Sequence, residues 1–123
     1  MSGMFHTKKN LHPDLIQQIM QLCSDPKART GTWVHHLKAW PEFFDAVADG
    51  RKTFEVRRND RGYREGDIIT LLRYEPERGS FTVDEGGRTI NLNRRITYVL
   101  EGGQFGIEYG FVVLGLGPVE TAP

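Results

Sequence analysis

The chain has 123 residues, and its 16 Lys and Arg residues balance its 16 Asp and Glu residues, so its formal net charge is zero. This length suits one domain that buries a core without a disulfide or a structural metal, and it excludes a second domain of ordinary size. A balanced charge also excludes indiscriminate binding to nucleic acid or to an anionic membrane, so any contact with a polyanion must be local.

Cysteine content and hydropathy bear on the cellular location. Cys23 is the single cysteine, so no disulfide can form within the chain and a reducing, intracellular environment is expected. The first residues are polar and mixed, and no apolar stretch is long enough for export or for a membrane span. We therefore expect a soluble, cytoplasmic protein without a membrane partner.

The predicted elements divide into an N-terminal extension at 1–32, a domain at 33–117 and a short tail at 118–123. The extension carries a short amphipathic helix over 13–22. The domain's apolar patterns and turn residues predict the following elements. In chain order these are a strand at 33–39, a helix at 41–49, and strands at 53–58, 68–74, 81–83, 89–100 and 111–116.

This order of elements predicts a mainly β fold with helices, of the α+β class. The turn at 84–88 suggests a hairpin between the two strands that flank it. Many short strands with one early helix favour a small β-barrel or a strongly bent sheet, because closing the sheet removes exposed edges.

The run from Gly50 to Arg58 concentrates more chemistry than packing requires. It follows the predicted helix, where Pro41 suits the first helical position and Gly50 suits the residue just past the helix end. From Arg51 to Arg64 the chain has six basic residues and two acidic ones, a local excess of +4. That excess can face a phosphate or a carboxylate.

After the helix, apolar residues alternate with polar ones, which predicts a strand. Phe54 and Val56 then share one face, and we expect this apolar pair to anchor the core. Thr53, Glu55 and Arg57 share the other face, which would meet solvent or a cleft.

A known family has the same signature. The segment from Gly50 to Glu55, with Lys52 at its third position, matches the G-x-K-x-x-E signature of ASCH domains, which are members of the PUA-like superfamily. The flanking segments agree in order, namely 36–44, then Gly66-Asp67 ahead of a strand, then 98–102 and 110–114. On these residues, about 33–117 of the chain resembles a short phage and bacterial branch of the ASCH domains.

The resemblance implies a PUA-like pseudo-β-barrel with a cleft beside the helix and the signature loop, proposed across the superfamily as a site for RNA or a modified nucleoside. The residue chemistry fits this use, because a positive loop can hold phosphate and Trp40 or Tyr74 can stack on a base. Glu55 can accept hydrogen bonds from base amino groups. The expected binding residues are Lys38, Trp40, Lys52, Glu55, Arg57, Arg58, Arg61 and Tyr74.

An enzymatic alternative comes from the same resemblance. Some ASCH proteins look like amidohydrolases of acylated cytidine that use the signature lysine, a threonine three residues later and a distant glutamate. Lys52 matches the lysine, but Glu55 stands at the position of the threonine, so that nucleophile is missing. A different mechanism would use Lys52 with Glu55 as an acid or base, and these two would then be the catalytic residues.

Structural readings remain open beside these functional ones. Lys52 and Glu55 would also form an ion pair that braces the loop, and the nearby arginines would form a solvated face. The N-terminal helix at 13–22 would pack on the domain, mediate dimerisation or make the protein an interaction module. His35 and His36 are adjacent on a predicted strand and point to opposite faces, so no zinc site is expected, and no cofactor is expected either.

Overall fold

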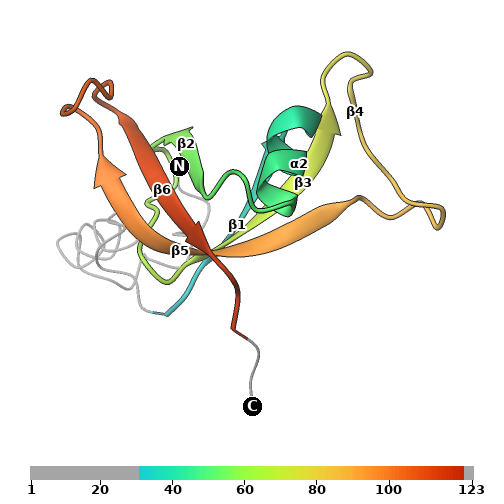
Figure 1. Ribbon diagram of the computed structural model, residues 1–123, viewed down its shortest axis with the longest axis horizontal. Coiled ribbons are helices and arrows are strands. Elements are labelled where there is room, and N and C mark those ends of the chain that lie inside the picture. The colour runs from blue at the N-terminus through green and yellow to red at the C-terminus, as the bar shows by residue number, and fades with distance from the viewer. Residues whose placement is uncertain (1–30, 121–123) are drawn as a thin grey trace, which may run out of the picture. The chain divides into compact units, whose positions relative to one another are not determined.

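A computed structural model describes residues 31–120 of the chain (Figure 1). The helix predicted at 13–22 and the last three residues of the predicted tail lie outside the described residues. No helix of the described part is long and apolar enough to cross a membrane. The described elements are β1 (Val34–Ala39), α2 (Pro41–Ala48), β2 (Phe54–Arg58), β3 (Ile68–Glu75), β4 (Ser80–Phe81), β5 (Asn91–Glu101) and β6 (Phe111–Gly117).

The strands form one mixed, six-stranded sheet in the order β1-β3-β5-β6-β2, with β4 paired to β3 outside this path. Strand β1 runs parallel to β3, and every other pair is antiparallel. The long strand β5 pairs with β3 through its first half and with β6 through the rest, so the sheet bends along it into two arms (Figure 1). The fold is therefore mainly β with one short described helix, in agreement with the predicted class.

The sheet is open between its two end strands, because no strand ladder joins β1 to β2 within residues 31–120. Two arginine side chains bridge this gap. Arg57 Nη2 donates to the carbonyl of Lys38 at 2.7 Å, and Arg61 Nη1 donates to the carbonyl of His36 at 3.1 Å. These bonds satisfy acceptors on the free edge of β1 and limit its exposure to another chain.

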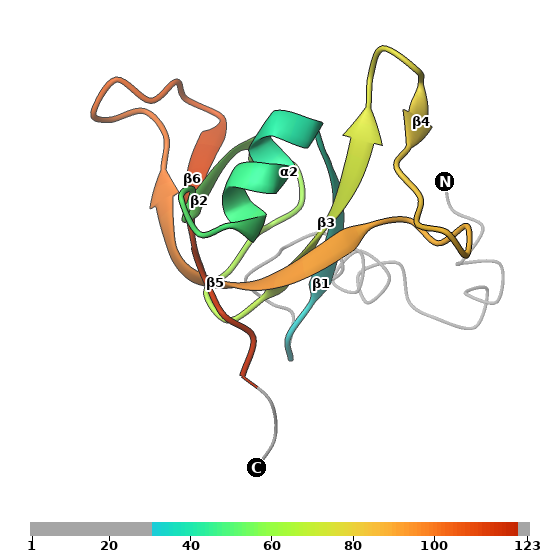
Figure 2. The same ribbon diagram turned by 45° about the vertical axis from the view of Figure 1, so that its right-hand side comes forward.

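Helix α2 begins and ends as its sequence predicts. Pro41 occupies its first turn, and Gly50 has a φ of 87°, a left-handed conformation that glycine adopts without a steric penalty. The helix packs against β3 on the inner side of the bent sheet (Figure 2), and Phe44 and Val47 are its buried residues. The other side of the helix is left for the site described below.

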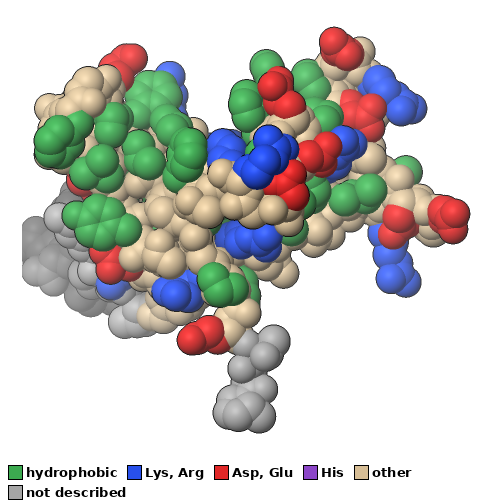
Figure 3. All heavy atoms as spheres, in the orientation of Figure 1, with side chains coloured by type: hydrophobic (Ala, Val, Ile, Leu, Met, Phe, Trp, Pro, Cys, Tyr) green, Lys and Arg blue, Asp and Glu red, His purple; other side chains and the backbone are tan. Residues whose placement is uncertain are grey.

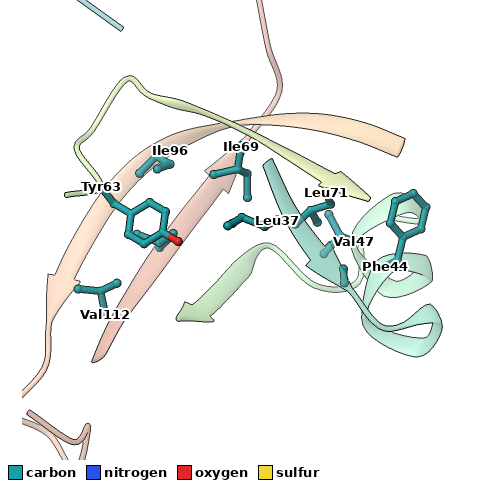
Figure 4. Packing of buried hydrophobic residues seen from close by; sticks show 10 residues of the cluster. Leu37, Phe44, Val47, Tyr63, Ile69, Leu71, Ile96 and Val112 are labelled. Atoms are coloured by element: carbon teal, nitrogen blue, oxygen red, sulfur yellow. The ribbon is translucent and has the colours of Figure 1, made fainter. Parts of the chain in front are cut away.

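One hydrophobic core lies between the arms of the sheet and the helix (Figure 4). Strands β1, β3, β5 and β6 contribute to it together with α2 and the segment between β2 and β3. Its buried members are Leu37, Ala39, Phe44, Val47, Tyr63, Ile69, Leu71, Ile96, Val112 and Leu114.

The predicted hairpin around 84–88 is present but short, since Asp84 N donates to Arg88 O at 2.8 Å and Ile90 N donates to Thr82 O at 2.9 Å. Val83 and Thr89 form an isolated bridge, and the Asp84 carboxylate accepts the backbone N–H groups of Gly86 and Arg88 at 2.9 Å each. The short strand β4 just before the hairpin also pairs with β3, because the turn after Glu75 folds the chain back on that strand. Strand β5 then starts at residue 91, two residues later than predicted.

The prediction that Phe54 and Val56 anchor the core is wrong. Their exposed fractions are 44% and 52%, whereas Glu55 between them is only 4% exposed. Register gives the reason, because Glu55 lies opposite Leu114 and so shares the inner face of the sheet. Strand β2 alternates as predicted, but its apolar residues face outward and Glu55 faces the core.

Candidate functional site

A cavity of about 520 Å³ lies where the end of β1, the start of α2 and strand β2 meet. The loop between α2 and β2 is held by backbone bonds, because Lys52 N donates to Ala46 O at 2.9 Å and Leu116 N donates to Thr53 O at 2.9 Å. These bonds fix the signature segment against both the helix and β6. The cavity is lined by Lys38, Ala39, Trp40, Phe43, Lys52, Phe54, Glu55, Val56 and Arg57.

A buried carboxylate organises two cations at this cavity. Lys52 Nζ lies 2.6 Å from Glu55 Oε1, and Arg57 Nε donates to Glu55 Oε2 at 2.9 Å. Lys52 Nζ also donates to the carbonyl of Phe54 at 2.7 Å, and Arg57 reaches the carbonyl of Lys38. Because Glu55 is almost fully buried, its chief role in the geometry is to position Lys52 and Arg57, whose side chains are more exposed.

Aromatic side chains form much of the remaining wall. The rings of Trp40 and Phe43 stack with centroids 6.4 Å apart, and Trp40 is 52% exposed. Lys52 Nζ lies 4.9 Å from the centroid of the Phe54 ring, within cation–π range. The wall thus offers flat apolar surfaces next to positive charge.

Lys38 is the cation of the cavity with the least compensated charge. Its ammonium lies 4.3 Å from the centroid of the Tyr74 ring, and no Asp or Glu of the described chain forms an ion pair with it. The Tyr74 ring is braced edge-on by Phe81 at 5.0 Å. Lys38 is therefore held by aromatic rings while its charge remains available to a ligand.

The structure brings five of the eight sequence-predicted residues to the cavity and places three elsewhere. Tyr74 lies behind Lys38, Arg58 stacks over the Phe111 ring at 4.9 Å, and Arg61 bonds to the edge of β1. The five that line the cavity are Lys38, Trp40, Lys52, Glu55 and Arg57.

Besides the buried Ala39, sequence reasoning missed three exposed apolar residues of the lining, namely Phe43, Phe54 and Val56. For Phe43 a signal was present, because adjacent phenylalanines on a short helix cannot both face the core, and Phe44 takes that place. For the other two residues no local signal separates a core face from a cavity face.

Hydroxyl and thiol nucleophiles are absent from the described lining of this cavity. Thr53, the nearest hydroxyl in sequence, lines a second cavity of about 460 Å³ together with Asn93 and Arg94. Arg94 is engaged there with the helix end, because its Nη2 donates to the carbonyl of Val47 at 3.2 Å. The described lining of the first cavity therefore offers no counterpart of the catalytic threonine of the amidohydrolase-like proteins, whereas Lys52 also lines the second cavity beside Thr53.

A second buried polar cluster lies near the start of β1. His35 Nε2 is 2.9 Å from Asp67 Oδ2, and the Asp67 carboxylate also accepts the backbone N–H groups of Trp33 at 3.2 Å and Arg64 at 3.1 Å. The Tyr63 ring packs on His35 at 4.8 Å, and burial raises the pKa of its phenol above 10.0. Within the described residues no group of three His, Cys, Asp or Glu could hold a metal ion.

Comparison with known proteins gives the family. The fold and the cavity define a mainly β domain, with an open mixed sheet and a cationic, aromatic-walled cavity beside its helix. Residues 34–116 match the family model described as "Domain of unknown function (DUF3850)", and the chain belongs to this family. A relative is the "Uncharacterized 12.9 kDa protein in GpA 3'region" of Escherichia phage P2, 41% identical over 68 residues. The aligned stretch covers 55% of each protein, so the chain spans about half the length of this curated relative.

Proposed function

We propose that the protein is a PUA-like, ASCH-type module that binds RNA or a modified nucleoside in the cavity between β1, α2 and β2. The observation that carries the proposal is the combination of exposed rings with three cationic side chains around one hollow. Its volume of about 520 Å³ falls within the range of about 300 to 1,000 Å³ that is typical of small-ligand sites.

The walls suit a nucleobase. Trp40 and Phe54 present rings that are 52% and 44% exposed, and stacking on aromatic rings is how proteins commonly hold unpaired bases. Such large apolar surfaces remain exposed at a cost in the free protein, which a bound base would remove. The rings thus supply affinity for a base but little discrimination between bases.

The cations suit the phosphate and sugar edge of such a ligand. Lys38 has no described ion pair, and Lys52 and Arg57 together carry one positive charge more than the Glu55 carboxylate neutralises. In this arrangement Glu55 keeps the two cations fixed in the unbound protein, so that less conformational entropy is lost when a ligand binds.

Each fixed residue of the signature segment has a structural role at the cavity. Gly50 makes the left-handed turn that ends α2, Lys52 reaches the cavity, and Glu55 holds it there. The G-x-K-x-x-E spacing is therefore compatible with a site-forming loop, which supports assignment to the PUA-like group. The open edge between β1 and β2, bridged by arginines, is compatible with a pseudo-barrel that lacks a closing ladder.

Equilibrium binding tests the proposal. Wild-type protein is titrated with mixed-sequence RNA, with single-stranded DNA of the same sequence and with acylated cytidine, by calorimetry and fluorescence anisotropy. We expect binding of RNA or the nucleoside, weakened about tenfold or more by Lys38→Ala and by Lys52→Ala, because a desolvated charge contact contributes roughly 1.5 to 3 kcal/mol. Arg88→Ala is the matched control, since Arg88 is exposed and lies in the turn before β5.

The same assay separates the rival functions. Hydrolysis of acylated cytidine that disappears in Lys52→Ala would show an amidohydrolase and overturn a purely binding role. Absence of binding to all three probes would overturn the proposal and favour a protein-interaction module. An equal loss of affinity in Arg88→Ala would show that binding depends on the overall positive charge and not on the cavity.

A further inference from the structure

The cavity continues into an exposed sheet face that the proposed function does not use. Register places Phe54, Gly115 and Tyr98 in one row across β2, β6 and β5, and Val56 lies beside Val113 in the next row. Residues paired across strands point to the same side of a sheet, so these side chains share one surface. We call this surface the outer face.

The outer face is unusually apolar for a surface exposed to water. Phe54, Val56 and Tyr98 are 44%, 52% and 59% exposed, and hydrophobic side chains gather over the arm formed by β5 and β6 (Figure 3). The solvent-exposed face of an antiparallel sheet normally carries polar residues, which alternate along each strand with the apolar residues of the core. Contiguous apolar surface of this kind marks an interaction site.

Cationic side chains lie over two of the aromatic rings of this surface. Arg58 and Phe111 are register partners in a third row, with the guanidinium carbon 4.9 Å from the ring centroid, and Lys52 lies over Phe54 at the same distance. None of the residues in these three rows is Asp or Glu. The chemistry that matches rings accompanied by cations is a chain of flat bases joined by phosphates.

The spacing of the first row also suits successive bases. Gly115 contributes no side chain between Phe54 and Tyr98, whose strands are two strand spacings apart, about 9 to 10 Å. A Cβ at Gly115 would lie 2.7 Å from Thr97 Oγ1, so the Thr97 side chain beside the β-bulge takes the space that a side chain here would need. The two rings are therefore separate platforms.

We propose that the outer face is a binding path for single-stranded RNA that leaves the cavity at Phe54 and crosses β6 to Tyr98. This inference rests on the proposed function, because Phe54 belongs both to the cavity and to the outer face. Bases stack on Phe54 and Tyr98 in the first row, and Arg58, which lies over Phe111 in the third row, meets a phosphate of the strand on that side of the path. A fully paired duplex does not fit this path, because its bases are already stacked on one another.

A length series tests the path. Anisotropy titrations compare the four ribonucleoside monophosphates with mixed-sequence oligoribonucleotides of about 3 to 16 nucleotides. This range covers the about 4 to 16 nucleotides that one single-strand binding fold contacts. We expect affinity to rise at least tenfold from monophosphate to the longest strand. Tyr98→Ser should remove roughly fivefold or more of that gain, the effect of one lost stacking platform, and leave monophosphate affinity unchanged.

Controls make the result specific to the outer face. Tyr109→Ser removes another tyrosine, 87% exposed in the loop between β5 and β6, and should leave the length gain intact. Arg58→Gln should reduce the slope of log affinity against log salt by about one phosphate contact for strands but not for monophosphates. Because Tyr98 is 59% exposed, we expect Tyr98→Ser to fold normally, which an unchanged circular dichroism spectrum would verify.

The outcomes distinguish failure of the path from failure of the cavity. Monophosphate binding without any gain in length, or a gain that survives Tyr98→Ser, overturns the path and leaves the proposed function standing. A length gain that depends on Tyr98 but not on Lys38 supports the path and overturns the cavity as the nucleoside site. No binding of monophosphate or strand overturns both, and equal affinity for a duplex overturns the path.

Discussion

Two nearly buried carboxylates serve this domain in different ways. Asp67 is 2% exposed near the start of β1, and Glu55 is 4% exposed on β2. Asp67 is satisfied by two backbone N–H groups and by His35, which is itself buried. Glu55 is satisfied by the side chains of Lys52 and Arg57, which line a cavity.

The comparison teaches that burial of a charge does not by itself mark a functional site. The partners of Asp67 are two backbone N–H groups and the buried His35, so its contacts stabilise one conformation of the loop ahead of β3. The partners of Glu55 are long cationic side chains that reach solvent, and such a pair can exchange contacts with a ligand. The two carboxylates therefore differ in their partners, which are backbone groups and a buried histidine for Asp67 but cavity-lining cations for Glu55.

The largest expected effect is at Asp67. Asp67→Ala leaves the N–H groups of Trp33 and Arg64 and the ring of His35 without this acceptor, so we expect the free energy of unfolding to fall by about 3 to 5 kcal/mol. Urea denaturation followed by circular dichroism measures it.

Asp60→Ala is the control for this change. The Asp60 side chain is 59% exposed, and its contact with Arg61 is long, at 3.9 Å. Its loss should therefore change the unfolding free energy by no more than about 0.5 kcal/mol. A similar small effect for Asp67→Ala would show that the buried cluster is not a structural element, and the contrast with Glu55 would disappear.

An intermediate effect is expected at Glu55. Glu55→Leu leaves two cations facing each other in a partly buried place, and we expect a loss of about 2 to 3 kcal/mol in the free energy of unfolding. Adding Lys52→Met and Arg57→Met removes both charges and should recover much of that loss, whereas RNA binding should be lost because two of the three cations of the cavity are gone.

This triple variant sharpens the contrast because it separates stability from binding. Recovery of stability without recovery of binding is the result expected of a charge cluster kept for a ligand. Full RNA affinity in the triple variant would show that the cluster only braces the loop. Failure to regain stability would show that the bond from Arg57 to the edge of β1 matters more than the ion pairs.

The smallest effect provides a reference for an exposed ion pair. Asp45 receives two bonds from Arg73, at 2.9 and 3.0 Å, and these hydrogen bonds hold the pKa of the Asp45 carboxyl below its usual 3.8. A lowered pKa in the folded state contributes stability above the usual value, and this is lost as pH falls through the lowered pKa. Because the Asp45 side chain is 54% exposed, we expect Asp45→Asn to cost only about 0.2 to 1 kcal/mol at neutral pH.

The pH dependence identifies the Asp45 contribution. The difference in unfolding free energy between wild type and Asp45→Asn should be constant from neutral pH down to about 5 and should shrink toward zero in more acidic solution. A difference that grows on acidification would contradict the assignment. An effect as large as that of Glu55→Leu would mean that burial adds little to the cost of breaking a pair.

Local residue chemistry determined the order of the elements. Pro41 and Gly50 bound the helix between them, and the strands lie within two residues of most predicted limits. These features depend on the conformational preferences of residues such as Pro and Gly, which act over a few positions and can be read from the sequence. The spacing of Lys52 and Glu55 likewise needs only one turn and the start of one strand, and the structure finds the two side chains in contact.

The sequence alone could not decide which way β2 faces. Alternation separates Phe54 and Val56 from Glu55, but it does not say which set faces the core. Only the favourable free energy of burying apolar side chains pointed to Phe54 and Val56 as core residues. The tertiary structure decided otherwise, because Lys52 and Arg57 compensate the buried carboxylate and the apolar pair faces the cavity and the outer face.

Long-range pairing decided the remainder. The gap between β1 and β2 is bridged by Arg57 and Arg61, whose bonds join residues 19 and 25 positions apart in sequence. No local pattern encodes such contacts, because they depend on where the bend in β5 places two distant edges. By itself, the sequence determined the elements and the charged signature, whose resemblance implied a cleft. Only the folded sheet showed which residues line that cavity and that its apolar wall continues across the surface.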